Sequence, residues 1–247
     1  MIEVWIVKFT DLLTTHQYYS LLSNLPVERQ QQLQKFHFQE DAQRSLIGDI
    51  IVQTLISEHL SLPKQNIILE KNNFGKPFLR NYPNFYFNVS HSGEYVTCAV
   101  SNHSIGIDIE IIKPIDLTLA SRFFTNNENE YINTGQSNLE QQHRFYSIWT
   151  RKEAYIKLYG RGLSIPLNSF DVLNFSPKNF YLCIQHTNHS VCHICTEQKE
   201  EPVIRYSSFN FLLFFYKSTR HFPACSHYFP KAGEARFHGR SRLFAFR

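Results

Sequence analysis

The order of its segments constrains this chain most, because a strand, helices and further strands follow one another twice. The first series contains a long helical segment, about Glu40–Leu60, in which apolar residues recur at helical spacing. The second contains about Leu139–Tyr159, where Ser137-x-x-Glu140 fits a capping box at the start and Gly160 fits the end. The order suggests two similar α/β halves that meet near Ser101–Ser104.

The remaining segments are shorter and are divided by turn signals such as NNFGKP and HSG. Asp116–Ile132 is expected to be helical. The segments expected to be extended are Ile2–Phe9, Ile67–Leu69, Phe85–Val89, Tyr95–Val100, Ile105–Ile109, Ser169–Val172, Phe180–Gln185 and Val191–Thr196.

Two carboxylates, Asp108 and Glu110, end the apolar segment SIGIDIE. Because side chains of a strand alternate between its faces, both should lie on one face, with Ile107 and Ile109 turned into the core. Two adjacent like charges repel each other, so a bound cation would account for the pair. Solvent exposure at a strand end is the simpler alternative.

The long second helix carries a third carboxylate in WTRKEAYIKLYGRGL. Glu153 and Lys157 are spaced i, i+4 and share a helix face, which on its own is typical of a surface ion pair. Combined with Asp108 and Glu110, however, Glu153 completes a set of oxygen ligands that suits Mg²⁺, an ion that commonly also binds substrate phosphate.

Groups suited to phosphate form the other notable set. Arg44 lies near the start of the first long helix, Lys76 lies in the turn Gly75–Pro77, and Ser90 and His91 follow a strand. If they converge, the arginine fork, the lysine charge and the hydroxyl would bind phosphate groups. Ser90 and His91 are not expected to form a hydrolase pair, because no G-x-S-x-G motif is present and neighbours on a strand point apart.

Together these segments resemble a known family. EDAQRSLIGDIIV, FGKPFLRNYPNFYFNVSHSGEYV, IGIDIE and FYSIWTRKEAYIKLYGRGLSIPLNSF stand in the order and with the gaps of 4′-phosphopantetheinyl transferases of the surfactin-synthetase (Sfp) type. The resemblance runs to about Phe170 and less clearly to Cys195. It implies a pseudo-twofold α/β (α+β) fold, in which residues 1–103 contact coenzyme A in a cleft between the halves and residues 104–204 hold the metal and the catalytic helix.

The resemblance also implies roles for individual residues. The carboxylates of Asp108, Glu110 and Glu153 would hold Mg²⁺ on the diphosphate of coenzyme A. The coenzyme contacts would be Arg44, Lys76, Ser90, His91 and Lys157, with Arg44 and His91 toward the 3′-phosphate. In PVERQQQLQKF the family often carries more basic residues for that phosphate, whereas here Arg29 and Lys35 are joined by glutamines.

The implied reaction transfers the 4′-phosphopantetheine arm of coenzyme A to a serine of an apo carrier protein and releases 3′,5′-ADP. From their i, i+4 spacing we expect Glu153 to take the serine proton, directly or through a metal-bound water, and Lys157 to stabilise or protonate the leaving phosphate. Peptide- or polyketide-synthetase carriers, as in nonribosomal peptide and antibiotic synthesis, are the expected partners. The alternative is a non-catalytic binder of coenzyme A or carrier protein, impaired by an altered C-terminus. A nucleotidyl transferase lacks support, because P-loop and kinase signatures are missing.

The run from Cys183 to Cys195 is rich in Cys and His and could suggest a zinc site. We favour a reduced hairpin with a turn at Thr187–His189, because the flanking residues read as two strands and His186 and Cys192 would not obviously meet in a tetrahedron.

The segment 205–247 departs from the family and carries eight basic residues but only one acidic residue. Three explanations compete: FLLFFY supplies a replacement strand and the rest is disordered, the tail binds an acidic carrier or a membrane surface, or it is an extension never selected to fold. We favour the last.

Composition limits the remaining possibilities. Apolar residues make up 43% and charged residues 19%, as in a globular protein. The basic excess is confined to the tail, so nucleic-acid binding is not expected. No apolar run approaches a membrane span, and MIEVWIVKF does not resemble a signal peptide. Five cysteines without such a leader indicate reduced thiols in the cytoplasm. A monomer would suffice, because two halves in one chain already build the cleft.

Overall fold

The computed structural model describes residues 1–174, 179–184, 187 and 189–210. The strands are β1 (Ile2–Lys8), β2 (Leu69–Lys71), β3 (Pro77–Leu79), β4 (Tyr86–Ser92), β5 (Tyr95–Ser101), β6 (Ile105–Ile111), β7 (Phe180–Ile184), β8 (Ser190–Thr196) and β9 (Val203–Ser208). The helices are α1 (Thr15–Leu22), α2 (Val27–Leu33), α3 (Gln39–Leu60), α4 (Leu119–Phe123), α5 (Asn126–Asn133) and α6 (Asn138–Tyr159), with 3₁₀ turns at Lys64–Asn66, Gly162–Ser164 and Leu167–Ser169.

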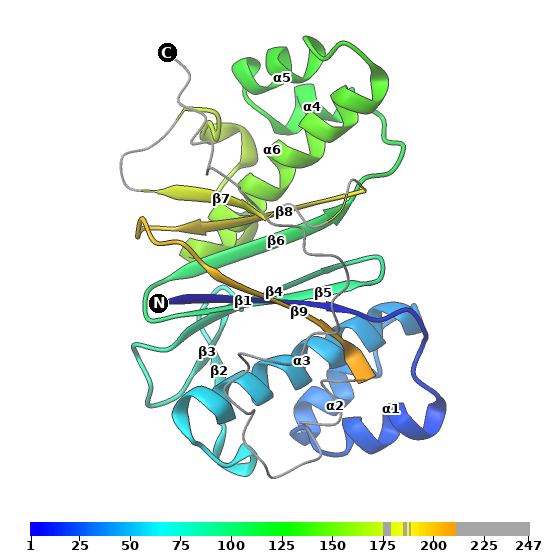
Figure 1. Cartoon of the computed structure of the whole chain (residues 1–247), viewed down its shortest axis with the longest axis vertical. Helices are drawn as coiled ribbons and strands as arrows, with labels where there is room; N and C mark the ends of the chain where they lie inside the picture. Colours follow the sequence, from blue (N-terminus) through cyan, green and yellow to red (C-terminus); the bar gives the residue numbers. More distant parts are fainter. Residues whose placement is uncertain (175–178, 185–186, 188, 211–247) are drawn as a thin grey trace, which may run out of the picture.

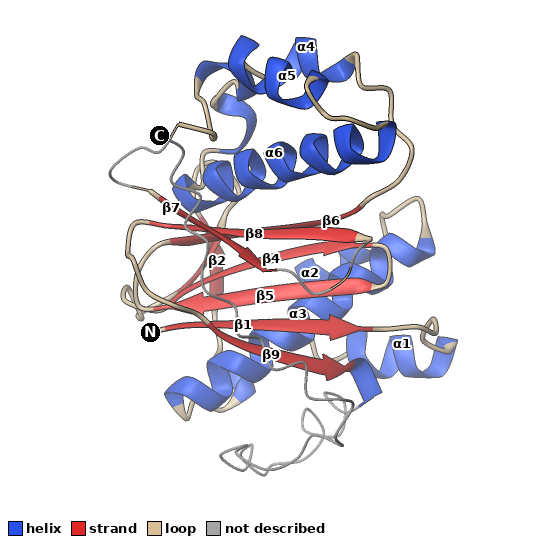
Figure 2. Ribbon diagram, turned by 45° about the horizontal axis from the view of Figure 1, so that its top comes forward, coloured by secondary structure: helices blue, strands red, loops and turns tan. Residues whose placement is uncertain are grey.

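The two main sheets lie in the middle of the molecule, with α1–α3 at one end and α4–α6 at the other (Figures 1 and 2). One sheet has the order β4-β5-β1-β9 and the other has the order β6-β8-β7. In the first sheet, β5 pairs antiparallel with both β1 and β4. In the second sheet, β8 likewise pairs antiparallel with both β6 and β7. The same arrangement in both halves confirms the predicted α/β class and agrees with a duplicated architecture.

The strands form because their apolar residues alternate between two cores. In β1, Trp5 and Val7 pack against α3, while Val4 and Ile6 face the second sheet. In β6, the isoleucines at alternate positions, Ile107 and Ile109 among them, enter the core shared by the two sheets. The prediction that Ile107 and Ile109 turn inward is therefore confirmed.

Both long helices are confirmed, and both end in a residue with left-handed backbone conformation, Ser61 after α3 and Gly160 after α6. Ser137 caps α6 by accepting a hydrogen bond from the amide of Glu140. The expected capping box is only half formed, because Glu140 accepts from the amide of Gln136 and not from that of Ser137. In the described part of the chain, no helix is both long and apolar enough to cross a membrane.

Some sequence predictions were wrong in detail. Ser169–Val172 is not a strand, because the Asp171 carboxylate accepts from the amides of Leu173 and Asn174 and bends the chain. The helical region Asp116–Ile132 is split into α4 and α5, where Thr125 and Glu128 form a capping box that starts a new helix. Ile67 follows a 3₁₀ turn, so β2 begins only at Leu69. The hairpin expected around Thr187–His189 is confirmed by the antiparallel pairing of β7 and β8.

Strand β9 was not predicted. It comes from the end of the second half but pairs parallel with β1 of the first half. The predicted boundary between residues 204 and 205 therefore falls inside a strand, and Phe209 after it is buried in the α3 core. The FLLFFY segment and the rest of the proposed disordered tail, residues 211–247, lie outside the described residues.

Candidate functional site

The three predicted acids lie on β6 and α6, which pack against each other beside β4. Helix α6 runs along β6 (Figure 1), and Gly106 allows this approach, since a Cβ there would lie 1.9 Å from the carbonyl oxygen of Ala154. Asp108 and Glu110 share the face of β6 opposite to the core isoleucines. Glu153 and Lys157 on α6 face this pair closely enough for their charges to affect it.

Strand β4 is joined to β6 through side chains. The amide of Ile107 donates to Asn88 Oδ1 over 2.9 Å, and the amide of Ile111 donates to Ser92 Oγ over 3.1 Å. Between them, the amide of Ile109 approaches Ser90 Oγ at 3.4 Å. Every second residue of β4 thus links the first half of the chain to the second. This polar seam holds Ser90 and Ser92 beside the acids of β6.

Asp108 is 4% exposed and has one satisfied oxygen. Its Oδ1 accepts hydrogen bonds from Lys157 Nζ at 2.6 Å and from Ser90 Oγ at 2.7 Å. Its Oδ2 is buried and has no hydrogen-bond partner among the described residues. Because buried polar atoms in proteins are nearly always satisfied, this oxygen has the character of a ligand for a cation.

Burial and neighbouring negative charge disfavour the ionised forms of the other two carboxylates, Glu110 and Glu153. Burial raises the pKa of Glu153, and the charge of Asp108 raises it further, although Lys157 opposes both. Burial likewise raises the pKa of Glu110, whose Oε2 accepts from Ser92 Oγ at 2.7 Å. The negative charge of the three carboxylates therefore exceeds the positive charge that Lys157 supplies.

The fit to a divalent ion rests on these observations. A free carboxylate oxygen and three mutually repelling acids match the hard oxygen ligands that Mg²⁺ prefers. In the described arrangement, however, no group of three or more His, Cys, Asp or Glu side chains is close enough together to hold a metal ion. That finding also covers the described part of the Cys183–Cys195 run, whose His186 lies outside the described residues.

Two of the predicted phosphate ligands lie on the other face of β4. Arg44 Nη1 donates to the carbonyl of Gly93 at 3.2 Å, and Arg44 also pairs with Asp41 at 2.5 Å. The pKa of His91 is lowered by burial and then by the charges of Arg44 and Lys157. The positive charges of Arg44 and Lys157 thus both reach His91, whose lowered pKa favours the neutral imidazole.

Lys76 and Arg29 are engaged elsewhere. Lys76 Nζ donates to the carbonyls of Leu158 at 2.9 Å and Ile105 at 3.2 Å, and burial lowers its pKa to about 8. None of its described hydrogen bonds joins it to Arg44 or His91. Arg29 of α2 forms an ion pair with Asp49 at 2.8 Å, which occupies its guanidinium.

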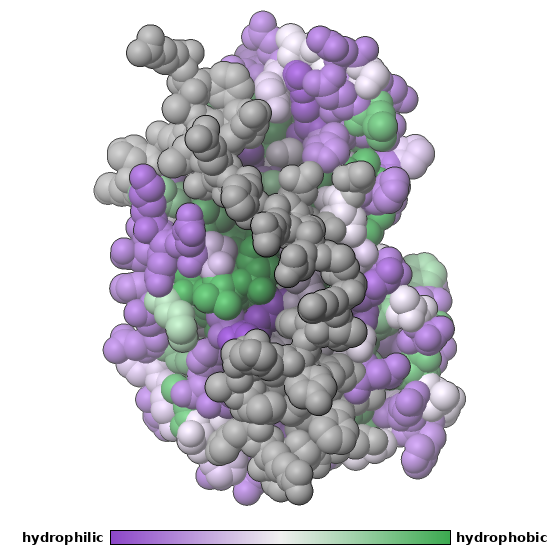
Figure 3. Space-filling model, viewed as in Figure 1, coloured by the Kyte–Doolittle hydropathy of each residue, from purple (hydrophilic) through white to green (hydrophobic). Residues whose placement is uncertain are grey.

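A cavity of about 330 Å³ lies between the β2–β4 region and the end of α6. Lys76, Tyr86, Ser104 and Tyr159 are among its lining residues, but the three carboxylates are not. On another face, which β9 crosses, apolar residues gather between the two halves (Figure 3). The predicted coenzyme cleft between the halves stays a prediction.

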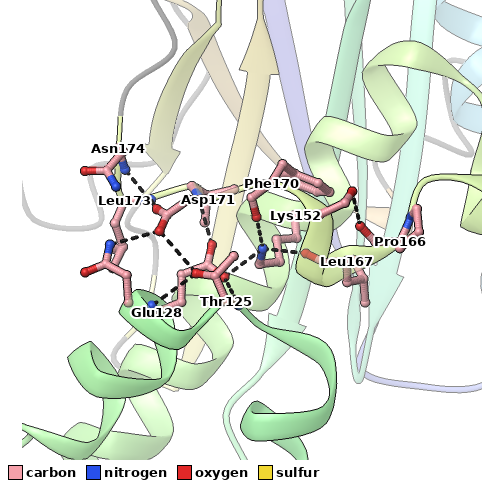
Figure 4. A network of polar contacts seen from close by, with 12 residues as sticks. Thr125, Glu128, Lys152, Pro166, Leu167, Phe170, Asp171, Leu173 and Asn174 are labelled. Atoms are coloured by element: carbon pink, nitrogen blue, oxygen red, sulfur yellow. Dashed lines mark hydrogen bonds and ion pairs between the residues drawn. The ribbon is translucent and has the colours of Figure 1, made fainter.

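Sequence reasoning missed a buried ion pair beside Glu153. Lys152 and Glu128 are both fully buried and lie 2.7 Å apart, and Lys152 Nζ also donates to the carbonyls of Leu167 and Phe170 (Figure 4). Glu128 in turn accepts from the amide of Val172. The network anchors the segment after α6 to the helix that presents Glu153. The alternation of Asn88, Ser90 and Ser92 marks a polar face of β4 in the sequence, but not the strand that this face meets.

Comparisons with known proteins agree on one family. Residues 13–103 match the family model described as 4′-phosphopantetheinyl transferase, N-terminal, and residues 104–208 match the 4′-phosphopantetheinyl transferase superfamily. The gsp 4′-phosphopantetheinyl transferase of Aneurinibacillus migulanus is 37% identical over 206 residues, which cover 83% of this chain and 80% of that protein. The Sfp transferase of Bacillus subtilis is 38% identical over 175 residues, or 71% of this chain and 77% of that protein. The human L-aminoadipate-semialdehyde dehydrogenase-phosphopantetheinyl transferase is 33% identical, over 62% of this chain and 53% of that protein.

Proposed function

Because the chain belongs to the Sfp-type 4′-phosphopantetheinyl transferases, we propose that the acids at the junction of β4, β6 and α6 are its active site. The chain is an enzyme that transfers the 4′-phosphopantetheine arm of coenzyme A to a serine of an apo carrier protein. The unpartnered, buried Oδ2 of Asp108, set between two further acids and a lysine, is the observation that carries the placement of the site.

We propose that Asp108, Glu110 and Glu153 hold Mg²⁺. The ion would neutralise charge on the diphosphate of coenzyme A. Removal of divalent ions with EDTA should abolish transfer, and added Mg²⁺ should restore it. Full activity in EDTA would contradict this assignment without affecting the choice of family.

The coenzyme would be bound by the basic and polar side chains next to the acids. Arg44, whose guanidinium is partly exposed, and His91 are proposed to meet the 3′-phosphate, while Ser90 and Lys157 meet the diphosphate. Lys76 stays a predicted coenzyme contact, although its ammonium already bonds to two carbonyls.

In the reaction, the carrier serine oxygen forms a bond to the phosphorus that bears the pantetheine arm. The bond from that phosphorus to the 3′,5′-ADP oxygen breaks, and the nucleotide leaves. We propose that the Glu153 carboxylate accepts the serine proton and that Lys157 donates a hydrogen bond to the leaving phosphate. Both residues stand on one face of α6, so one helix would present the base and the cation together.

The test uses purified protein with coenzyme A, Mg²⁺ and an apo carrier protein. Intact-mass spectrometry should show the carrier gaining one phosphopantetheine arm. Glu153→Gln should slow transfer by roughly 100- to 10,000-fold, as expected for loss of a general base. The matched control is Glu130→Gln on the exposed face of α5, which should transfer at the normal rate. Normal turnover by Glu153→Gln would remove Glu153 from the chemistry.

We also propose where the protein acts, its oligomeric state and the class of its carrier proteins. We propose a cytoplasmic location, supported by free thiols at all four described cysteines, Cys98, Cys183, Cys192 and Cys195. We propose a monomer, since the seam between β4 and β6 joins the two halves within one chain. The carriers would be those of peptide or polyketide synthetases, because the Sfp transferase of Bacillus subtilis matches 71% of this chain.

A further inference from the structure

The turn between β2 and β3 belongs to the first half but closes on the end of α6 in the second. Asn72 organises this turn, because its Oδ1 accepts from the amides of Phe74 and Lys76, both at 2.9 Å. Its Nδ2 donates to the carbonyl of Gly160 at 2.9 Å. One side chain therefore shapes the turn and fastens it to the residue that ends the helix.

Lys76 makes the second attachment. Its ammonium donates to the carbonyl of Leu158 in the last turn of α6 and to the carbonyl of Ile105, the first residue of β6. Carbonyls at a helix C-terminus lack partners within the helix, and a cation there also opposes the negative end of the helix dipole. Ser104 Oγ donates to the same Leu158 carbonyl at 2.9 Å.

The contact leaves no room for a side chain at Gly160. Its φ of 61° lies in the left-handed region, and a Cβ there would lie 2.5 Å from Lys76 Cδ and 3.1 Å from Asn72 Nδ2. A side chain at this position would push the turn away from the helix. The turn and the helix end therefore depend on each other for their approach.

The attachment lies next to the proposed catalytic residues. Leu158 follows Lys157, whose Nζ contacts Asp108 Oδ1 at 2.6 Å. A single ammonium thus joins the helix that carries Lys157 to the strand that carries Asp108. Any shift of α6 along β6 would have to break it.

We infer that Lys76 is a positioning residue: through the Leu158 and Ile105 carbonyls it holds α6 in register with β6, so that Lys157 and Glu153 meet Asp108. This inference rests on the proposed function for its kinetic consequence. It differs from a coenzyme contact, because the ammonium acts on the backbone of the enzyme and not on a phosphate.

The first experiment compares Lys76→Met with Lys71→Met, which removes an exposed lysine from the neighbouring strand β2. With saturating carrier protein, Lys76→Met should lower kcat by about tenfold to a hundredfold, the range for a small misplacement of catalytic groups, while KM for coenzyme A stays nearly unchanged. Lys71→Met should change neither constant. Lys76→Arg, which keeps the charge and the donors, should recover part of kcat.

A large rise in KM with kcat preserved would overturn the inference and support the coenzyme contact instead. Unchanged kcat and KM would also overturn it. If Lys76→Met proved too unstable to assay, Lys76→Arg and Ser104→Ala would be compared with the double variant that combines them. Because Lys76 and Ser104 both donate to the Leu158 carbonyl, the double variant should lose more of kcat than the two single losses combined. A double variant that loses no more than the two together would contradict the shared anchor.

A second readout does not depend on transfer. Amide hydrogen exchange should accelerate in the last turn of α6 in Lys76→Met but not in Lys71→Met. Unchanged protection of that turn would reject the positioning role even in an active enzyme. If the wild-type protein failed to modify any carrier while this exchange difference held, the proposed function would fail and the structural role of Lys76 would stand.

Discussion

Glu3 in the first half and the acids of the proposed site in the second half are all buried to some extent, but their surroundings differ. Glu3 of β1 is 7% exposed and is surrounded by donors: Trp5 Nε1 at 2.6 Å, Arg205 Nε at 2.8 Å and His59 Nε2 at 3.4 Å. Burial alone would raise the pKa of Glu3, but these donors outweigh it and lower the pKa to about 2.

The acids of the proposed site, Asp108, Glu110 and Glu153, have fewer donors. Burial raises the pKa of Glu110 and of Glu153, and Asp108 adds to both shifts. A carboxylate that stabilises a fold is supplied with hydrogen bonds, whereas these carboxylates are left in need of positive charge. Such carboxylates are typical of functional sites, which supports the proposed site.

The halves also differ in how closely a helix approaches its sheet. Gly48 of α3 faces a side chain, since a Cβ there would lie 3.0 Å from Val89 Cγ1. Gly106 of β6 faces backbone, since a Cβ there would lie 1.9 Å from the carbonyl oxygen of Ala154 and 2.5 Å from the amide nitrogen of Leu158. Helix α6 therefore sits deeper on its sheet, which brings Glu153 and Lys157 within reach of β6.

The largest expected effect comes from filling these two glycines. Gly106→Ala should destabilise the protein by about 5 kcal/mol or more, beyond ordinary overpacking, because backbone on the helix must move. Gly48→Ala should change the free energy of unfolding by less than about 1 kcal/mol, since Val89 can shift and alanine favours a helix. Urea denaturation of both variants measures the difference. Equal effects of the two substitutions would refute the closer approach of α6.

A second comparison concerns ion pairs, which also differ in burial between the halves. Lys152→Met leaves the fully buried Glu128 without its cation and should cost about 3–5 kcal/mol. Arg205→Met removes a pair to Glu3 whose arginine side chain is 34% exposed, so its cost should be only about 1 kcal/mol. Thermal and urea unfolding of the two variants test this order.

The control for Lys152→Met is a double variant with Glu128→Gln. The neutral side chain can still accept the amide of Val172 but no longer buries an uncompensated charge. Lys152→Met with Glu128→Gln should therefore be more stable than Lys152→Met alone. If the double variant were the less stable of the two, the cost would lie in lost packing and not in the buried charge.

Sequence patterns correctly predicted the features that depend on a single strand or a single helix. Strand alternation placed Ile107 and Ile109 in the core, and helical spacing put Glu153 and Lys157 on one face of α6. The family resemblance then brought the three acids into a single site, which no pattern within β6 or α6 alone could do. The proposed metal ligands stay a prediction for the experiments described above.

What the sequence could not show depends on segments that meet only after folding. The seam from Asn88 to Ser92 uses the amides of β6, and a sequence does not reveal which strand edge will lie beside which. The bond of Lys76 to the end of α6 could not be predicted, because nothing local shows that a helix ends at its ammonium. Strand β9 was missed because its partner β1 stands at the opposite end of the chain.

The smallest expected effect tests the satisfied acid of the first half by pH. The folded pKa of Glu3, about 2, lies below its ordinary value of 4.5, so its contribution to stability is present above pH 4.5 and is lost as the pH falls toward 2. His59, whose pKa is raised by its hydrogen bond to Glu3, stays charged below pH 6. Wild type should exceed Glu3→Gln by about 1–2 kcal/mol at pH 6, after allowance for solvent screening, and by less at pH 3. Urea unfolding at both pH values measures this gap, with Glu130→Gln as the control for removing an exposed charge. A gap that stays constant between pH 6 and pH 3 would show that Glu3 is not the satisfied carboxylate on which the contrast between the halves depends.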